Sequence, residues 1–491
     1  MTLNTLIFAF ATIGLLLTYI FGKWVKKPDH WWLSFLKNFV GVWFIFSGFV
    51  KAVDPMGTAF KMEQYFAAFQ QTFEATKASF LVPLFSSLSH YTVSFSIFMI
   101  LLEILLGVAL IIGYAPKLTA WILLILLIFF TKLTGFTYLT GYVPSNSNFF
   151  DFSAWGDYEP LQMRVSDCGC FGDFLKLDPK VSFFKDLFLL IPGVLFVIWA
   201  KAKHQLWTVG VRRGIMVISL LVSLLFCSYN TFMNEPIWDF RPFRNGADIA
   251  TTRKMELDAA QAVQIEKAQV KNKKSGEILS VPYATYMKEF KKYPKEDWDT
   301  KFVYGESTVT KTKVSEFQIL DEHGTDVTLD ILNNEGYSLM VNAYKIHGNT
   351  ITVDKVQTDS IFIDSLVIQN KDTVRLKIFA GTNQVTNKVD QFEPTKADFD
   401  IFDQQINPLV NVLTKEGIKT FAVTGGLGSS HMNDFAQKIN AAYPIYQADD
   451  ILLKTIMRSN PGLILWKNGK IIQKWHYKQL PSLEELRALM K

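Results

Sequence analysis

The stretch Val165–Leu190, "VSDCGCFGDFLKLDPKVSFFKDLFLL", places two cysteines one residue apart just before a long apolar run. Cys168 and Cys170 are two of the three cysteines in the 491-residue chain. A cysteine-poor chain that pairs its thiols beside such a run raises two questions. The first is whether the run crosses a membrane, and the second is which side of that membrane the thiols face.

Apolar residues are concentrated in the first 232 positions of the chain. Several runs there approach the length of about 20 residues that a helix needs to cross a bilayer. The pattern predicts an α-helical membrane bundle of six transmembrane helices in contact with the lipid bilayer, followed by a soluble region. The six predicted spans are Leu3–Phe21, Leu33–Val53, Thr92–Gly113, Leu118–Leu133, Ser182–Ala200 and Gly214–Phe232.

The first run has the look of a secretion signal, and the fourth is shorter than the others. No Lys or Arg precedes the first run, and no small-x-small cleavage site follows it before Lys23, so it is predicted to be a retained helix rather than a secretion signal. The fourth run is short, and the adjoining "TGFTYLTGYVPSN" could lengthen it.

Lys and Arg in the short loops predict the orientation. Three lysines lie in "GKWVKKPDHW" after the first span, and two lysines and two arginines lie in "KAKHQLWTVGVRR" after the fifth. Loops one, three and five are therefore predicted to be cytoplasmic, which places both chain ends and the cysteine loop outside. In a Gram-negative bacterium this is an inner-membrane protein with a periplasmic N-terminus and C-terminal domain, and the periplasm is a compartment where disulfides persist. The net charge of +5 requires no nucleic-acid partner, because positive-inside anchoring accounts for much of it.

Residues 234–314 have the composition of a soluble segment. The stretch Phe243–Glu277 mixes charges with alanine and is predicted to be an exposed helix or tether, so the segment is expected to be a polar linker. Residues 315–491 then alternate strand and helix patterns, which predicts an α/β layer with helices on both faces. Strands are expected at "YSLMVNAY", "TFAVTGG" and "YPIYQA", a hairpin is expected around Asn468-Gly469, and a long polar insert spans about 347–394.

The order of elements in residues 315–491 resembles the thioredoxin fold, most specifically in "SNPGLILWKNGKIIQKW" (Ser459–Trp475). The resemblance implies a cis peptide bond before Pro461, and X-Pro is the bond where the cis form is least costly. Redox-active thioredoxins carry CxxC after the first central strand, but this chain has "NAYKIHGN" there and no cysteine after Cys227. The expected role of this domain is therefore to dock a periplasmic protein partner.

The segment from Asp167 to Cys170 carries the chemistry expected of the membrane half. Two cysteines with one residue between them can close a small, strained and easily reduced disulfide, and Gly169 allows the backbone angles that such a ring needs. Asp167 disfavours ionisation of the thiols, whereas the start of the following helix favours it. The alternatives are a fixed structural disulfide and a pair of unpaired buried thiols. Two thiolates alone make half a zinc site, so no metal is predicted.

The membrane half contains the pieces "FIFSGFVKAVDPMGTAFKMEQYF", "LLEILLGVALIIG" and "DCGCFGDF". In these pieces it resembles the DoxX/MauE group of bacterial helical membrane proteins. The resemblance implies a DoxX-like four-helix core at residues 32–201. Residues 1–31, the first span and its cytoplasmic loop, and residues 202–233, the sixth span, would be additions to it. As a whole the chain is similar to fused DoxX-family proteins of Bacteroidetes. The resemblance implies a link to quinone-coupled or thiol–disulfide redox chemistry, with quinone as a possible cofactor.

Charged residues inside predicted spans are costly and therefore indicate sites. Glu103 lies near the middle of the third span, Lys51 and Asp54 close the second, and Lys132 closes the fourth. Glu103 could form a structural ion pair with Lys51 or Lys132, or take part in a proton relay for quinone reduction. Lys51 and Asp54 are expected at the outer interface, and Cys227 is expected to be a packing residue.

Two functional hypotheses follow. In the first, Cys168 and Cys170 cycle between dithiol and disulfide, which makes the chain a component of a thiol–disulfide or quinone oxidoreductase system. In the second, the protein is a non-catalytic membrane-anchored scaffold that binds envelope proteins, with Cys168–Cys170 as a structural disulfide. A small-molecule or metal carrier is a third, less supported class, because no binding motif is visible.

Overall fold

The computed structural model describes residues 2–74, 76–165, 167–202, 204–305, 307–369 and 372–491. The chain divides into two compact units, Met1–Arg244 and Asn245–Lys491. The first is called the membrane unit below and the second the C-terminal unit, and each is described by itself.

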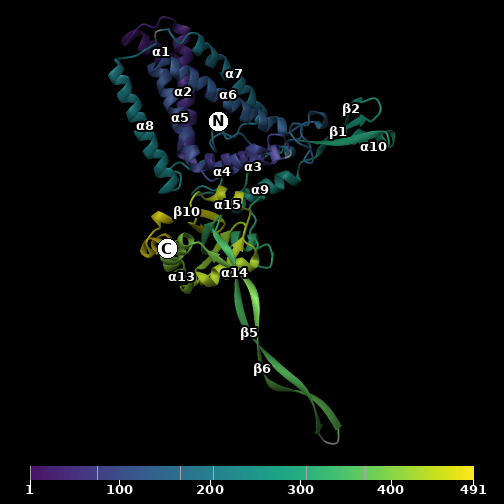
Figure 1. Cartoon of the computed structure of the whole chain (residues 1–491). Helices are drawn as coiled ribbons and strands as arrows, with labels where there is room; N and C mark the ends of the chain where they lie inside the picture. The colour runs from purple at the N-terminus through teal and green to yellow at the C-terminus, as the bar shows by residue number, and fades with distance from the viewer. Residues whose placement is uncertain (1, 75, 166, 203, 306, 370–371) are drawn as a thin grey trace. The chain divides into compact units, whose positions relative to one another are not determined.

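The membrane unit contains six helices that are long and apolar enough to cross a bilayer, which confirms the six predicted spans. The structure extends the fourth span seven residues past its predicted end at Leu133, because the Gly- and Thr-containing segment continues the helix to Thr140. In Figure 1 these helices run alongside one another in purple to teal. Their bounds are α1 Leu3–Trp24, α2 Trp31–Val53, α5 Thr92–Ile112, α6 Pro116–Thr140, α7 Pro179–Ile198 and α8 Val209–Phe232.

Glycines bring α2 and α5 close together. A Cβ atom added at Gly107 of α5 would lie 2.6 Å from the carbonyl oxygen of Gly41 on α2, and one added at Gly48 would lie 2.6 Å from Ile104 Cγ1. Small residues at helix interfaces allow backbones to approach in this way, which matters in lipid, where apolar burial does not drive association. This close contact also determines how near to each other Lys51 and Glu103 lie, the charged residues about one turn from these glycines on α2 and α5.

Two further helices, α3 (Pro55–Glu74) and α4 (Val82–Ser89), follow α2, and Figure 1 shows α3 running crosswise to α2 and α5. The loop between α6 and α7 packs onto α3, where Asn148 Nδ2 donates to the Thr72 carbonyl at 2.9 Å. At the other end of the bundle, His204 after α7 lies 2.8 Å from Ser34 of α2. Loops after even-numbered spans therefore meet one another, as do those after odd-numbered spans, which is the arrangement that six consecutive crossings require.

The C-terminal unit is built on a five-stranded sheet in the order β10-β9-β4-β7-β8. Strands β4, β7 and β8 are parallel, whereas β9 is antiparallel to β4 and to β10. β4 is buried along nearly its whole length, as expected for a central strand that reads as a continuous apolar run. The strand bounds are β4 Tyr337–Ala343, β7 Lys419–Thr424, β8 Ile445–Gln447, β9 Gly462–Lys467 and β10 Lys470–His476.

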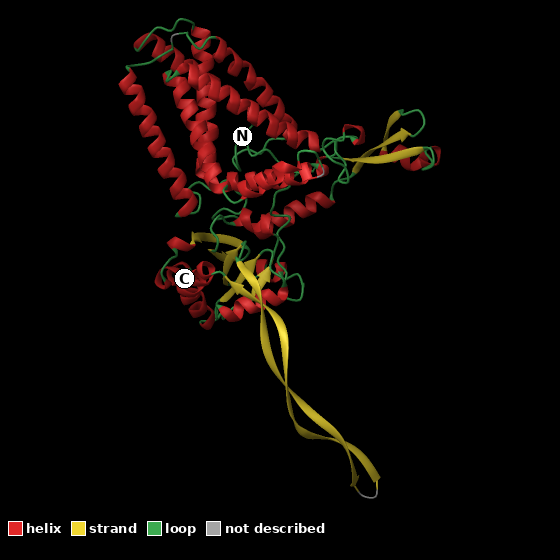
Figure 2. Ribbon diagram, viewed as in Figure 1, coloured by secondary structure: helices red, strands yellow, loops and turns green. Residues whose placement is uncertain are grey.

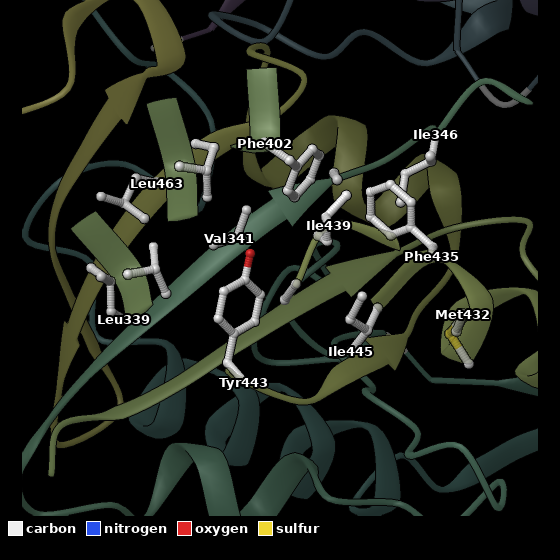
Figure 3. Packing of buried hydrophobic residues seen from close by; sticks show 14 of the residues in the cluster. Leu339, Val341, Ile346, Phe402, Met432, Phe435, Ile439, Tyr443, Ile445 and Leu463 are labelled. Atoms are coloured by element: carbon white, nitrogen blue, oxygen red, sulfur yellow. The ribbon is translucent and has the colours of Figure 1, made fainter. Parts of the chain in front are cut away.

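The core of this unit lies between the sheet and its covering helices. Figure 3 shows Leu339, Val341 and Leu463 from the sheet facing Phe402 and Phe435 from the helices. Phe402 belongs to a short π-helical segment, Phe402–Ile406, which forms a wide turn between α12 and α13. The helices of this unit outside residues 245–314 are α11 Thr328–Leu332, α12 Lys396–Ile401, α13 Asn407–Lys415, α14 Ser429–Lys438, α15 Asp450–Ile456 and α16 Leu483–Leu489.

The insert after β4 forms a long two-stranded antiparallel ribbon, β5 (Gly348–Gln369) with β6 (Asp372–Pro394), seen as paired yellow strands in Figure 2. A bulge between Ile361 and Phe362 interrupts the register. Phe362 and Phe379 form an edge-to-face pair there at 6.0 Å, and both side chains remain more than half exposed.

The stretch Phe243–Glu277, predicted to be an exposed helix or tether, is only partly helical. Helix α9 (Ile249–Gln261) is present, but the stretch that follows forms a strand, β1 (Ile265–Asn272). β1 is the centre of a three-stranded antiparallel sheet with β2 (Ile278–Pro282) and β3 (Trp298–Tyr304), and α10 (Tyr283–Glu289) packs beside it. The helix prediction was wrong for β1, in which Lys267 and Lys271 are exposed while Ala268 and Val270 are buried, the alternation of a strand.

Candidate functional site

The loop that carries Cys168 and Cys170 is held on α2 by an aromatic side chain. Phe171 is 1% exposed and its ring lies 6.0 Å from that of Trp43 and 6.2 Å from that of Phe46. The hydroxyl of Ser47, one residue further along α2, is 3.1 Å from the carbonyl oxygen of Cys170. A stripe at helical spacing on α2 therefore fixes the position of the second cysteine.

Gly169 and Asp167 shape the turn between the two thiols. Gly169 has a φ of +61°, a conformation that residues with a Cβ rarely adopt, as the sequence predicted for this position. Its N–H donates to Asp167 Oδ1 at 3.0 Å, and Asp167 Oδ2 pairs with Lys61 of α3 at 3.1 Å. Burial opposes ionisation of Asp167, but Lys61, Lys176 and the Gly169 N–H together outweigh it, so the pKa of Asp167 lies below its ordinary value. Asp167 thus anchors the cysteine loop to α3.

Cys168 and Cys170 both carry free thiols and are half-buried. Burial raises the pKa of Cys168 to about 12; Cys170 and Asp167 act in the same direction, while the hydroxyls of Ser182 and Thr137 oppose them. Burial also raises the pKa of Cys170, against the opposing effect of Lys185. Desolvation dominates at both thiols, a cause that the sequence, which pointed to nearby carboxylates, did not indicate.

The ionisation of Cys168 gives a pH-dependence that can be measured. With a pKa raised to about 12, its thiolate fraction should rise roughly a hundredfold between pH 8 and pH 10, against roughly fourfold for a thiol at the ordinary value of about 8.5. Iodoacetamide labelling of the reduced protein, quantified for Cys168 by mass spectrometry, reports this ratio. Urea-unfolded protein serves as the control and should show the shallow profile. A shallow profile in the folded protein would contradict the buried environment of this thiol.

Beside the cysteine loop lie two ion pairs, which we call the buried charge pairs. In the first, Lys51 Nζ lies 2.5 Å from Glu103 Oε1, and the two side chains are 9% and 2% exposed. Ser47 links this pair to the loop, because its hydroxyl is 3.0 Å from Glu103 Oε2 and 3.2 Å from Lys51 Nζ. In the second, Lys185 pairs with Asp186 on α7, and Asp186 accepts a hydrogen bond from Thr134 at 3.0 Å.

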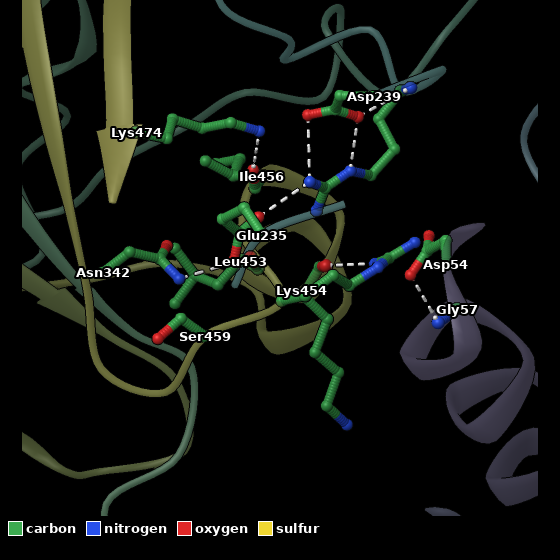
Figure 4. A network of polar contacts seen from close by, with 12 residues as sticks. Asp54, Gly57, Glu235, Asp239, Asn342, Leu453, Lys454, Ile456, Ser459 and Lys474 are labelled. Atoms are coloured by element: carbon green, nitrogen blue, oxygen red, sulfur yellow. Dashed lines mark hydrogen bonds and ion pairs between the residues drawn. The ribbon is translucent and has the colours of Figure 1, made fainter. Parts of the chain in front are cut away.

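The predicted charged residues behave differently from one another. The sequence allowed either Lys51 or Lys132 as the ion-pair partner of Glu103. In the structure Glu103 pairs with Lys51, and Lys132 is exposed on α6. The expectation that Lys51 lies solvated at the interface was wrong, because the glycine contact between α2 and α5 draws it into the bundle. Asp54 lies apart from both charge pairs and accepts from the Gly57 N–H at the start of α3, as Figure 4 shows.

Sequence reasoning missed Lys185 and Asp186. Both lie inside the predicted fifth span, in "FFKDLF", so the rule that drew attention to Glu103 applies to them equally. Tyr65, whose hydroxyl is 2.7 Å from that of Thr137, was also missed. No local sequence pattern marks Tyr65 as a neighbour of the thiols, because α3 is far from them in the sequence and comes close to them only when the chain folds.

Two remaining predictions concern packing and the C-terminal unit. Cys227 is fully buried with Ala52, Ile100 and Ile104, as expected of a packing residue. The Asn460–Pro461 peptide bond is cis, as predicted, and the Asn460 side chain bonds to the backbone of Lys345. Figure 4 also shows Asn342 at the end of β4 bonded to the carbonyl of Leu453, and Lys474 of β10 bonded to that of Ile456.

Across the residues that the structure describes, no group of three or more His, Cys, Asp or Glu side chains gathers as metal ligands would. Comparisons with family models, with curated proteins and with solved structures find no match to this chain.

Proposed function

We propose that this protein is a membrane component of thiol–disulfide electron transfer, in which Cys168 and Cys170 cycle between dithiol and disulfide. The observation that carries the proposal is the environment of the two thiols. They are free, half-buried and one residue apart, on a loop in which the backbone carbonyl of Cys170 accepts a hydrogen bond from Ser47, which in turn accepts one from Lys51 of the Lys51–Glu103 pair. Buried charges in a membrane bundle are costly, and their placement beside a dithiol is the feature that a purely structural loop does not need.

The chemistry balances with a quinone as the electron acceptor in the bilayer. Oxidation of the dithiol forms one S–S bond and releases two electrons and two protons, and reduction of a quinone to a quinol consumes the same number of each. Glu103 is the group that we propose to pass protons toward the bundle, with Lys51 as its counter-ion and Ser47 as the hydrogen-bonded link to the loop. Electrons would enter the pair from a dithiol protein partner.

The C-terminal unit supports the docking half of the proposal. A sheet with three parallel strands, an antiparallel β9 next to β4 and a final β10 at the edge is the arrangement expected of a thioredoxin-like domain. No cysteine follows Cys227, so this domain would bind a partner rather than exchange disulfides with it. A docking domain on the same chain raises the effective concentration of the partner at the membrane thiols.

We further propose a DoxX/MauE-like four-helix core within the membrane unit and a location in a bacterial inner membrane, with the cysteine end periplasmic. The meeting of the loops after even-numbered spans at the cysteine end, and the Lys and Arg in the loops at the opposite end, support this orientation. Leu161 lies in the same loop as the cysteines and is 98% exposed, so a membrane-impermeant maleimide should label a Leu161→Cys variant in intact spheroplasts; a cysteine there that reacts only after the cells are lysed would contradict the orientation.

A second candidate function rests on the β5–β6 ribbon. Its exposed Phe362 and Phe379 are unusual on a soluble strand pair and favour contact with another protein. In this alternative the chain is a non-catalytic scaffold for envelope proteins, and Cys168–Cys170 is a structural disulfide that never changes state.

Thiol trapping in native membranes separates the two functions. Cells are quenched with acid and alkylated after the quinone pool has been oxidised or reduced, and the state of Cys168 and Cys170 is scored by mass spectrometry. The redox proposal expects the pair to shift from disulfide to dithiol as the pool is reduced. A pair that remains in one state throughout supports the scaffold instead. Cys227 serves as the internal control, because it is buried and should remain a thiol in both conditions.

A further inference from the structure

The two thiols of the pair lie in different surroundings. Cys170 packs against the apolar cluster that contains Trp43 and Phe171, whereas Cys168 is not part of that cluster. The inner position of Cys170 follows from the burial of Phe171, the next residue, which pulls the second cysteine toward the bundle. Cys168 is the less deeply buried of the two thiols.

Charges are distributed unevenly between the thiols. Lys185 is the charged residue with the largest effect on Cys170, followed by Asp186 and Lys51. Its ammonium group lies 6.0 Å from the centre of the Phe171 ring, over the residue adjoining Cys170, and the side chain is 9% exposed. A positive charge held this close in a water-poor setting stabilises a thiolate at Cys170.

Two neutral hydroxyl groups face Cys168, and Lys185 interacts with this thiol less strongly than with Cys170. Thr137 and Ser182 oppose the effect of burial on this thiol. The Ser182 hydroxyl is fully buried and, within the described part of the chain, has no hydrogen-bond partner apart from that thiol. The Ser182 hydroxyl can donate a hydrogen bond to the sulfur of Cys168 when that sulfur carries full or partial negative charge during exchange. The Thr137 hydroxyl is shared with Tyr65.

We propose that an incoming thiolate attacks Sγ of Cys168 and that Cys170 is the leaving group, with Lys185 as the positioning residue that stabilises the departing thiolate. The inference deepens the proposed function, on which it rests. In the step, the attacking sulfur forms a bond to Cys168 Sγ, the Cys168–Cys170 bond breaks, and its electron pair remains on Cys170. A second thiolate of the donor then attacks the mixed disulfide, which releases Cys168, so the donor becomes a disulfide and the pair becomes a dithiol.

Two independent criteria agree on this direction. Thiol–disulfide exchange proceeds faster at the sulfur that is more accessible and when the departing thiolate is the more stable one. Cys168 meets the first criterion because it is less deeply buried than Cys170, and Cys170 meets the second through Lys185. Attack in the opposite sense would place the new bond inside the aromatic cluster and the departing charge among neutral hydroxyl groups.

The test uses the full-length protein in detergent micelles with the pair first oxidised by diamide and then reduced by glutathione. In wild-type protein, acid-quenched samples should carry the glutathione adduct on Cys168 in at least tenfold excess over Cys170. An adduct mainly on Cys170, or a pair that diamide cannot close, would overturn the inference. This measurement needs no substitution and so does not depend on the folding of any variant.

Lys185 is tested by rate. Lys185→Met should slow reduction by glutathione about tenfold, whereas Lys185→Arg should keep most of the wild-type rate because the positive charge is retained. Lys180→Met, an exposed lysine at the start of the same helix, is the matched control and should leave the rate unchanged. Equal rates for Lys185→Met and wild type would refute the role of Lys185. Failure of the quinone-dependent shift in native membranes would instead count against the proposed function and leave this chemistry standing.

Discussion

Replacing Glu103 by Leu should destabilise the membrane unit by about 3–5 kcal/mol, because it leaves the ammonium group of Lys51 buried without its counter-ion. Lys51 and Glu103 are 9% and 2% exposed and lie 2.5 Å apart, so neither can turn to solvent without moving α2 or α5. The glycine contact between those helices makes such a movement costly. Thermal unfolding of the full-length protein in detergent, compared with wild type, measures the loss.

The double variant Lys51→Met/Glu103→Leu tests whether the unpaired ammonium group causes this loss. Removing both charges takes away the unpaired cation as well as the pair, so most of the lost stability should return. Lys132→Met, which removes an exposed lysine from α6, should change stability by less than about 0.5 kcal/mol. If Glu103→Leu alone unfolds at the wild-type temperature, the pair is not held charged inside the bundle, and a proton relay through Glu103 loses its basis.

Replacing Phe435 by Ala should destabilise the C-terminal unit by about 3–5 kcal/mol, the range for deleting a buried aromatic side chain. Phe435 is fully buried, and its ring lies edge-on to Phe402 at 5.0 Å in the core that Figure 3 shows. It also contacts Phe392 at the base of the ribbon, with ring centres 6.4 Å apart. The cavity should therefore loosen both the helix layer and the root of β6.

Pulse proteolysis of the full-length protein in urea can measure this effect, with cleavage scored in residues 315–491. Leu329→Ala, which truncates a side chain that is 59% exposed in the same unit, is the matched control and should shift the midpoint little. A Phe435→Ala midpoint close to that of the control would show that the core tolerates the loss, and would contradict the close packing around Phe402.

The sequence predicted those features that depend on neighbouring residues. The six spans were confirmed because each is a continuous apolar run of sufficient length, and the bend at Gly169 followed from a single residue type. The neighbours of Cys170 were not predicted, since Ser47 and Lys185 lie on separate helices and meet the loop only after packing. Lys185 and Asp186 could have been found, because two charges within an apolar run are visible without a structure.

In the C-terminal unit, too, the strands that were predicted are those marked by neighbouring residues in the sequence. β4, β7 and β9 were expected from apolar runs that pack in the middle of a sheet, and all three are present. The β5–β6 ribbon was seen only as a polar insert, although the stretch "TVRLKIF" (Thr373–Phe379) alternates apolar and polar residues as a strand does, so this strand could have been found. β1 was taken for part of a helix since its buried face is only Ala268 and Val270, too few residues to show a period of two.

Hydrogen exchange at the backbone amides of the β5–β6 ribbon reports whether a further strand pairs with either of its edges. In a two-stranded antiparallel pair, every second N–H of each strand points away from the partner strand. Deuterium uptake along β5 should therefore alternate between slow and fast from one residue to the next, with a break at the Ile361/Phe362 bulge. A strand from another protein that joined one edge would slow the fast amides on that edge alone, so the exchange pattern would identify which edge had been taken.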